Sequence, residues 1–98
     1  MIRVEFFEEA GDEIEFERGY YREHSITAEA AFLRELDHAI SVVSEAPLRW
    51  PLHTQNTRRY VFPSFPFSLV YIAENDVIVV VALESHSKRP GYWHKRLR

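Results

Sequence analysis

Apolar and polar side chains alternate at the start of the chain. Residues 2–7 read Ile-Arg-Val-Glu-Phe-Phe and place Ile2, Val4 and Phe6 on one face. A period of two is the repeat of a β-strand, whose successive side chains point to opposite faces. We therefore predict a strand over residues 2–7 with one apolar face.

The apolar spacing then changes to the helical period. Residues 8–23 are predicted as a first helix and residues 28–46 as a second, more clearly amphipathic one. The stripe of the first helix is Ala10, Ile14, Glu17 and Tyr21, and that of the second is Phe32, Leu36, Ala39, Ile40 and Val43. Residues 24–27 separate them, and Ser25 or Thr27 can cap the second helix. So short a break predicts an antiparallel helical hairpin.

The second half of the chain has the pattern of strands. A loop over residues 47–57 leads to strand signals at 58–62, 67–73 and 77–84. Glu74-Asn75-Asp76 is a good tight turn between the last two of these strands. The run Val77-Ile-Val-Val-Val-Ala-Leu83 is apolar at every position, which predicts a central strand covered on both faces.

This order of elements defines an α+β fold, β-α-α-β-β-β, with a helical hairpin packed on a small, mostly antiparallel sheet. A central last strand can pair with the first strand from the far end of the chain. With 98 residues and no internal repeat, residues 1–98 are predicted to form a single domain.

Composition and charge narrow the class of protein. The chain has no cysteine, which excludes disulfides and thiolate zinc sites and fits a reducing cytosol. No apolar run is long enough to span a bilayer, and the acidic start lacks the features of a secretion signal, so we expect a cytoplasmic protein. Residues 1–46 hold 4 Lys or Arg and 12 Asp or Glu, whereas residues 47–98 hold 8 and 3. The second half can attract anionic partners, although the acidic first half also fits ordinary solvated helix faces.

Several short motifs, taken together with this order of elements, resemble the RelE/ParE toxin superfamily. The motifs in the helices are Ala10…Glu13-Ile14, Tyr20-Tyr21, Phe32…Leu36…Ala39-Ile40 and Pro47. Those in the strands and the tail are Arg58-Arg59, Phe65-Pro66-Phe67, Leu69-Val70-Tyr71, Ala82 and His86-x-x-Arg89-Pro90-Gly91-Tyr92-Trp93. The Phe-Pro-Phe entry to a strand and the Tyr-Trp ending are the most specific of these features. Many relatives are basic overall, whereas this chain carries a net charge of −3.

The resemblance implies the toxin of a type II toxin–antitoxin module, associated with plasmid stabilisation and growth inhibition. A ParE-like member inhibits DNA gyrase by binding and is neutralised by a cognate antitoxin. A RelE-like member is instead a metal-independent, ribosome-dependent mRNA endoribonuclease, and a third alternative is an inactive orphan binding module. The expected partners are therefore an antitoxin and either gyrase or the ribosome with its mRNA, in a homodimer or a toxin–antitoxin hetero-oligomer, without a membrane.

Arg58, Arg59 and His86 are candidates for chemistry. An arginine can hold a phosphate bidentately, and a histidine can transfer protons near neutral pH. Neighbours on a strand point to opposite faces, so at most one of the two arginines can reach a given pocket. Each also has a structural reading, as a strand arginine paired with the acidic helices or as a histidine that fixes the tail. Glu84 falls on the same face as His86, and we expect a surface ion pair between them.

The C-terminal tail mixes basic and aromatic side chains, which suits contact with an anionic partner or nucleic acid. Arg89 and Tyr92 join the catalytic candidates of an enzymatic member. The predicted target- or partner-binding residues are Lys88, Arg89, Tyr92, Lys95, Arg96, Tyr20 and Tyr21. Trp93 is expected to be packed and Tyr92 half-exposed. No cofactor motif and no metal-ligand spacing is present, so neither a cofactor nor a metal is expected.

Overall fold

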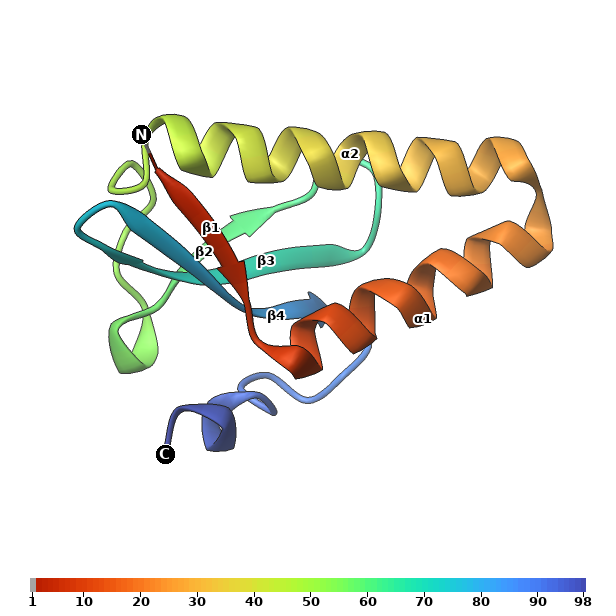
Figure 1. The fold of residues 1–98 in the computed structure, drawn as a ribbon. Coiled ribbons are helices and arrows are strands. Elements are labelled where there is room, and N and C mark those ends of the chain that lie inside the picture. The colour runs from red at the N-terminus through yellow and green to blue at the C-terminus, as the bar shows by residue number, and fades with distance from the viewer. Residues whose placement is uncertain (1) are drawn as a thin grey trace.

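The computed structural model describes residues 2–98 and contains one four-stranded sheet with two long helices (Figure 1). The order of elements is the predicted β-α-α-β-β-β, with short 3₁₀ turns added in the loop and the tail. The bounds are β1 Arg3–Phe6, α1 Glu8–His24, α2 Ile26–Glu45, η1 Thr54–Asn56, β2 Arg58–Val61, β3 Phe67–Glu74, β4 Val77–Ser85 and η2 His94–Leu97.

The strands lie in the order β1-β4-β3-β2. β4 pairs antiparallel with β3 through the tight turn, and β3 pairs antiparallel with β2. β1 joins the other side of β4 in parallel, with Arg3 opposite Val77 and Phe6 opposite Val80. The predicted central last strand and the mostly antiparallel sheet are therefore confirmed.

The two helices form the predicted hairpin, with a single residue between them. Ser25 is extended, and its hydroxyl accepts a hydrogen bond from Ala28 N at 2.9 Å. The choice between Ser25 and Thr27 as the cap is thus decided for Ser25. The second helix accordingly begins two residues earlier than residue 28, because Ile26 and Thr27 lie inside its first turn.

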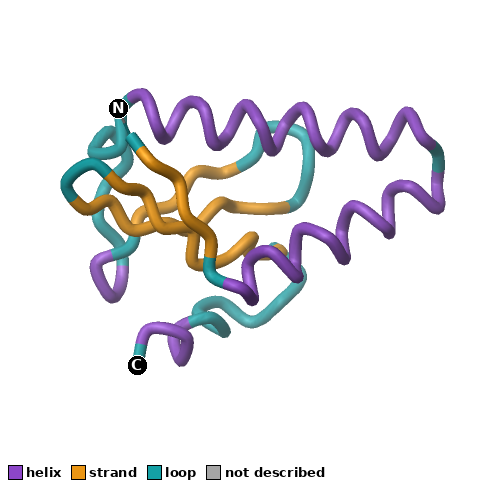
Figure 2. The backbone as a smooth tube through the Cα atoms, viewed as in Figure 1, coloured by secondary structure: helices purple, strands orange, loops and turns teal. Residues whose placement is uncertain are grey.

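The helical hairpin lies over one face of the sheet (Figure 2). The main core is formed by side chains of the two helices and of this face. The predicted stripe of α2 supplies Phe32, Leu36, Ala39 and Val43, all buried. Tyr21 of α1 stacks on Phe32 with ring centroids 5.4 Å apart. The other face of the sheet is covered by the C-terminal tail, so β4 is buried on both sides as its uniform apolar run predicted.

The predicted apolar face of β1 is only partly correct. Ile2 and Val4 pack against the main core, but Phe6 is 43% exposed. Phe7, just beyond the strand, contacts the main core and also a second core, which Val70, Val81, Ala82 and Trp93 form under the tail. The alternation breaks here because the chain leaves the sheet to enter α1 at Glu8.

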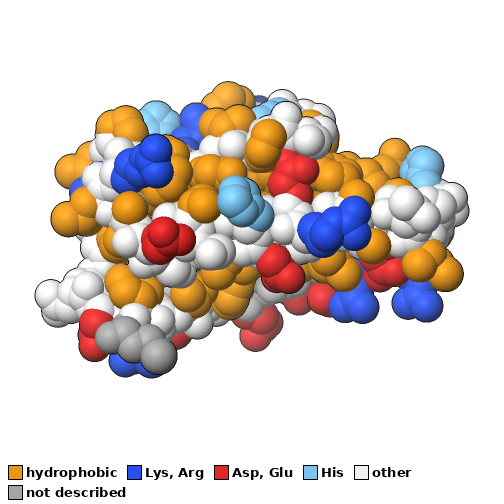
Figure 3. Space-filling model, turned by 90° about the horizontal axis from the view of Figure 1, so that it is seen from above, with side chains coloured by type: hydrophobic (Ala, Val, Ile, Leu, Met, Phe, Trp, Pro, Cys, Tyr) orange, Lys and Arg blue, Asp and Glu red, His pale blue; other side chains and the backbone are white. Residues whose placement is uncertain are grey.

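The face carried by α2 has mixed chemistry (Figure 3). Basic, acidic and apolar side chains alternate across it without a patch of one charge. Among residues 2–98, no helix has the length and apolar composition needed to cross a membrane.

Candidate functional site: a pocket under the C-terminal tail

Residues 86–98 fold back beneath the sheet, on the side away from α2 (Figure 1). Trp93 is buried at 1% exposure against Val70, Val81 and Ala82, and Tyr92 is half-buried beside it, as expected for both rings. A turn at Pro90-Gly91 allows this reversal, and Tyr92 N donates to Arg89 O across it at 3.2 Å. Gly91 has a φ of +77°, and a Cβ there would lie 2.7 Å from the His94 ring, so glycine is required.

A largely buried carboxylate fastens the tail to the first helix. Glu13 of α1 accepts hydrogen bonds from Arg96 Nη1 at 3.0 Å and Nη2 at 2.8 Å. The same carboxylate accepts from the Tyr92 hydroxyl and from Leu83 N of β4. Arg96 also donates to the carbonyl of Val81, at 3.0 Å, where the register between β3 and β4 shifts and Val81 has no partner. One arginine thus satisfies both a carboxylate and a β-bulge carbonyl.

These contacts perturb the titration of both tail residues. Burial raises the pKa of the Tyr92 phenol well above its ordinary value, and the hydrogen bond to Glu13 raises it further. The hydrogen bonds to Glu13 raise the pKa of Arg96. Arg96 therefore stays charged and engaged within the chain.

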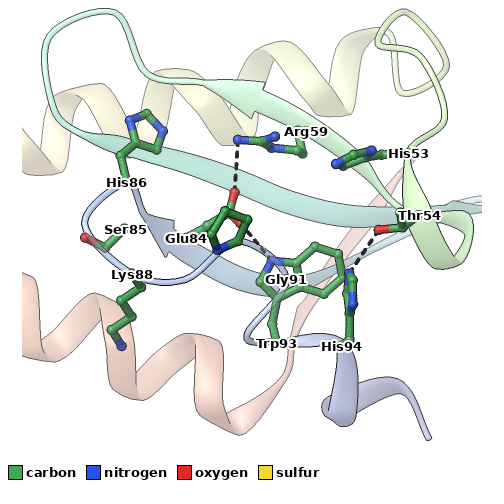
Figure 4. Close-up of a pocket in the computed structure, with 11 residues that line it drawn as sticks. His53, Thr54, Arg59, Glu84, Ser85, His86, Lys88, Gly91, Trp93 and His94 are labelled. Carbon is green, nitrogen blue, oxygen red and sulfur yellow. Dashed lines mark hydrogen bonds and ion pairs between the residues drawn. The ribbon is translucent and has the colours of Figure 1, made fainter.

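The folded tail encloses a pocket of about 410 Å³ with the sheet and the loop that precedes β2 (Figure 4). Its wall combines basic, imidazole and aromatic groups with one carboxylate. The lining residues are His53, Thr54, Arg59, Glu84, Ser85, His86, Lys88, Pro90, Gly91, Trp93 and His94. Because β2, β4, the loop and the tail all contribute, the pocket depends on the tertiary fold.

At the base of this pocket, the carboxylate of Glu84 is held between two partners (Figure 4). Its Oε1 lies 3.1 Å from Arg59 Nη2, and its Oε2 accepts a hydrogen bond from Trp93 Nε1 at 3.1 Å. The Glu84 side chain is only 8% exposed, whereas that of Arg59 is 36% exposed. The positive charge that Arg59 brings to the pocket is therefore largely balanced by an internal carboxylate.

His86 does not form the expected ion pair with Glu84, so that prediction was wrong. Its Nε2 lies 2.9 Å from the Ser68 hydroxyl, and its backbone N–H donates to Pro66 O at 2.9 Å. The strand alternation correctly placed both residues on one face, but Glu84 is buried under Trp93 and paired with Arg59 instead. The main-chain bond does not involve the imidazole, so it does not distinguish the structural reading of this histidine from the catalytic one.

The loop before β2 closes the far side of the pocket. His94 Nε2 lies 3.0 Å from the Thr54 hydroxyl, which joins the tail to the loop (Figure 4). The loop is itself fixed by Thr57, whose hydroxyl donates to Thr54 O at 2.7 Å. Sequence reasoning overlooked His53 and Thr54 here, because no local pattern brings the 47–57 loop beside the tail.

The structure separates the two neighbouring arginines. Arg59 points into the pocket, whereas Arg58 donates to the carbonyls of Trp50 and Leu48 and holds the loop. The two side chains thus point to opposite faces of the sheet, as adjacent residues of a strand must. Arg59 is thus the one of the pair that can meet a ligand in this pocket.

The remaining predicted site residues fall into two groups. Exposed at the surface are Lys88, Arg89, Lys95 and Tyr20. The Lys88 ammonium also lies 4.8 Å from the centre of the Tyr92 ring. Engaged inside the chain are Arg96, through Glu13, and Tyr21, whose ring packs edge-on against Phe65.

The pocket can receive an anionic group at the exposed part of Arg59 and at Lys88. Proton transfer would fall to His86, whose ring already contacts Ser68. In the part of the chain that the structure describes, no three His, Asp or Glu side chains are grouped as a metal site requires.

The fold is similar to that of a solved chain from the "Chromosomal ParDE TA system from P. aeruginosa". The two chains superpose with a TM-score of 0.69 at 13% sequence identity, over 87% of this chain and 96% of that one. No protein-family model and no curated protein matches the sequence. The chain therefore has the RelE/ParE-like α+β fold that its C-terminal motif and order of elements implied.

Proposed function

We propose that this chain is the ParE-like toxin of a type II toxin–antitoxin module, active in the cytoplasm and neutralised by a cognate antitoxin. DNA gyrase is the first target to test, and the proposed mode of action is binding rather than catalysis. The observation that carries the proposal is the likeness in fold to a chain of a ParDE toxin–antitoxin system, which extends over most of both chains.

One feature of the pocket favours binding over catalysis. The charge of Arg59 is largely balanced by Glu84. Cleavage of a phosphodiester needs cations directed at the phosphorane. By contrast, Lys88, Arg89 and Lys95 are exposed and available for contact with a macromolecular target.

The first test is controlled expression in a bacterial host with a DNA-damage reporter. Growth arrest with reporter induction and intact mRNA is expected, and purified chain should inhibit supercoiling by purified gyrase. Growth arrest without either gyrase effect would refute the choice of target.

Matched variants link the effect to the tail. Lys88→Gln combined with Arg89→Gln should lower inhibitory potency about tenfold, which corresponds to the loss of roughly 1.4 kcal/mol of binding. Arg34→Gln removes the same kind of charge from an exposed position on α2 and should leave the potency unchanged. Equal effects of the two changes would argue against a role for the tail.

A RelE-like ribonuclease is the second candidate, because Arg59, His86 and Lys88 do line one pocket. Primer extension on mRNA after incubation with translating ribosomes tests it. Codon-specific cuts that disappear in His86→Gln would establish this function in place of the first. Normal growth on expression, without cuts or reporter induction, would favour an inactive binding module.

A further inference from the structure

The surface of α1 exposes two aromatic rings one helical turn apart. Phe16 is 72% exposed and Tyr20 is 51% exposed, although the neighbouring Tyr21 is packed into the core. Exposed aromatic side chains that lie together on a rigid element commonly mark a contact surface. The tail pocket does not include either ring.

A groove of about 420 Å³ runs beside Phe16, between α1 and the end of β4. Leu83 and the Phe16 ring give it an apolar wall, and Lys88 of the tail stands at its edge. The groove is lined by Asp12, Glu13, Phe16, Glu17, Leu83, Ser85 and Lys88. A side chain from another protein can therefore be inserted next to an exposed aromatic ridge.

The charge around the two rings has one dominant sign. At about 100° per residue, helical geometry places five carboxylates on the same side of α1 as the aromatic rings. Glu13 is paired with Arg96, whereas the other four, Glu9, Asp12, Glu17 and Glu23, take part in no ion pair among residues 2–98. We call the two rings with these four carboxylates the acidic α1 face.

The basic residues of α1 do not balance this face. Arg18 Nε lies 2.8 Å from Glu29 Oε2 on α2, and Arg22 Nε lies 3.9 Å from Glu29 Oε1. Both arginines are thus directed toward the second helix. Lys88 is the cation that lines the groove from the tail.

The carboxylates at the groove differ in whether they already have an ion-pair partner. Glu13 is already paired with Arg96. Burial raises the pKa of Glu17, although the positive charge of Lys88 partly opposes this rise. A partly desolvated carboxylate without an ion-pair partner gains from an added cation, which makes Glu17 the natural contact for an incoming arginine or lysine.

We propose that the acidic α1 face docks a basic amphipathic helix of a partner protein, with apolar anchors on Phe16 and Tyr20 and cationic side chains at Asp12 and Glu17. The proposal rests on the proposed function in that this partner is the neutralising antitoxin. α1 has 17 residues and is about 25 Å long, which matches a partner helix of several turns. Charge complementarity selects a basic segment, in contrast to the anionic one that the basic tail alone would suggest.

The test is an in vitro display selection on the purified chain. The library consists of helical peptides of about 20 residues, long enough to cover α1, with randomised surface positions. Counter-selection uses the Phe16→Ser/Tyr20→Ser variant, which should fold because both side chains are exposed. Enriched peptides are expected to carry net positive charge and two or more apolar residues on one face.

Charge reversal then tests the electrostatic part. Asp12→Lys combined with Glu17→Lys should weaken the enriched peptides about tenfold or more, and raising the salt from about 0.05 M to about 0.5 M should weaken them as well. Ile26→Ser and Asp37→Lys are the matched controls, because both residues are exposed and lie on α2. They should change the affinity less than about twofold.

Three results would overturn the proposal: acidic enriched peptides, equal binding to the double serine variant, or no peptide whose binding depends on this face. The growth assay is independent of all three. Growth arrest without a preference for basic helices would refute only the docking proposal. Basic helices bound at the acidic α1 face, without toxicity, would refute only the proposed function.

Discussion

Replacing Glu13 with alanine is expected to release the C-terminal tail from the sheet. The change removes the acceptor for both Arg96 nitrogens and for Leu83 N. The side chains of Arg96 and Glu13 are 11% and 13% exposed, so water can replace the lost contacts only after the tail moves. Removing one partner of a buried pair costs about 3–5 kcal/mol, and the residual exposure places this pair near the lower limit.

A loss of about 3 kcal/mol is large for a chain of this size, whose total stability is typically about 5–15 kcal/mol. With a urea m value of about 1 kcal/mol/M, the midpoint should fall by about 3 M. Amide hydrogen exchange should show that residues 86–98 lose protection before the strands do. A double-mutant cycle between Glu13→Ala and Arg96→Ala should give a coupling energy of about 2 kcal/mol or more.

The exposed pair between Arg3 and Glu5 is the matched control. Its side chains are 66% and 56% exposed, with 3.3 Å between Arg3 Nη2 and Glu5 Oε2. Exposed pairs contribute less than about 1 kcal/mol, so Glu5→Ala should hardly move the midpoint. If Glu13→Ala were no more destabilising than Glu5→Ala, the clamp on the tail would not be a buried network and the reasoning would be refuted.

Three further predictions concern stability. Trp93→Ala should lower the free energy of unfolding by about 3–5 kcal/mol, because the indole fills the second core, and a urea midpoint unchanged from wild type would contradict that packing. Ser25→Ala should lower the free energy of unfolding by about 1 kcal/mol, because the cap on Ala28 N is lost, whereas Ser25→Asp should retain most of the stabilisation by the cap. Thermal denaturation can measure both changes. Burial raises the pKa values of both Tyr71 and Tyr92 in the folded chain. The contribution of these phenols to the free energy of unfolding is therefore fully present below about pH 10, and it is lost as the pH rises through their pKa values in the folded chain. The stability should therefore decline in alkali, and Tyr92→Phe should decline less steeply; an identical decline would exclude Tyr92 as its source.

The elements with strong periodicity were predicted well from the sequence. The continuous stripe from Phe32 to Val43 determines which side of α2 is buried, whatever the helix packs against. Likewise, the uniform apolar run of β4 requires cover on both faces, and only a central position with a packed tail supplies it. These predictions succeeded because the apolar pattern within each element determines which of its faces is buried.

The site was harder to predict because its contacts join distant segments. The alternation of β2 allowed only one of Arg58 and Arg59 to reach the pocket, but it gave no means of choosing between them. Similarly, Glu84 was assigned to the surface because Trp93, which buries it, arrives from a separate segment. The carboxylate of Glu13 carries no local signal at all, since its partner Arg96 lies at the other end of the chain.

The parallel pairing of β1 with β4 has a consequence for synthesis. Of the four strands, β1 is made first and β4 last, and Phe6 meets Val80 only after the residues between them have been made. Translation adds about 5–20 residues per second, so β1 waits for several seconds without its partner. Non-local pairing of this kind also slows folding. The complete four-stranded sheet therefore cannot form until β4 has been made, and the residues from β1 to β3 remain without their central strand until then.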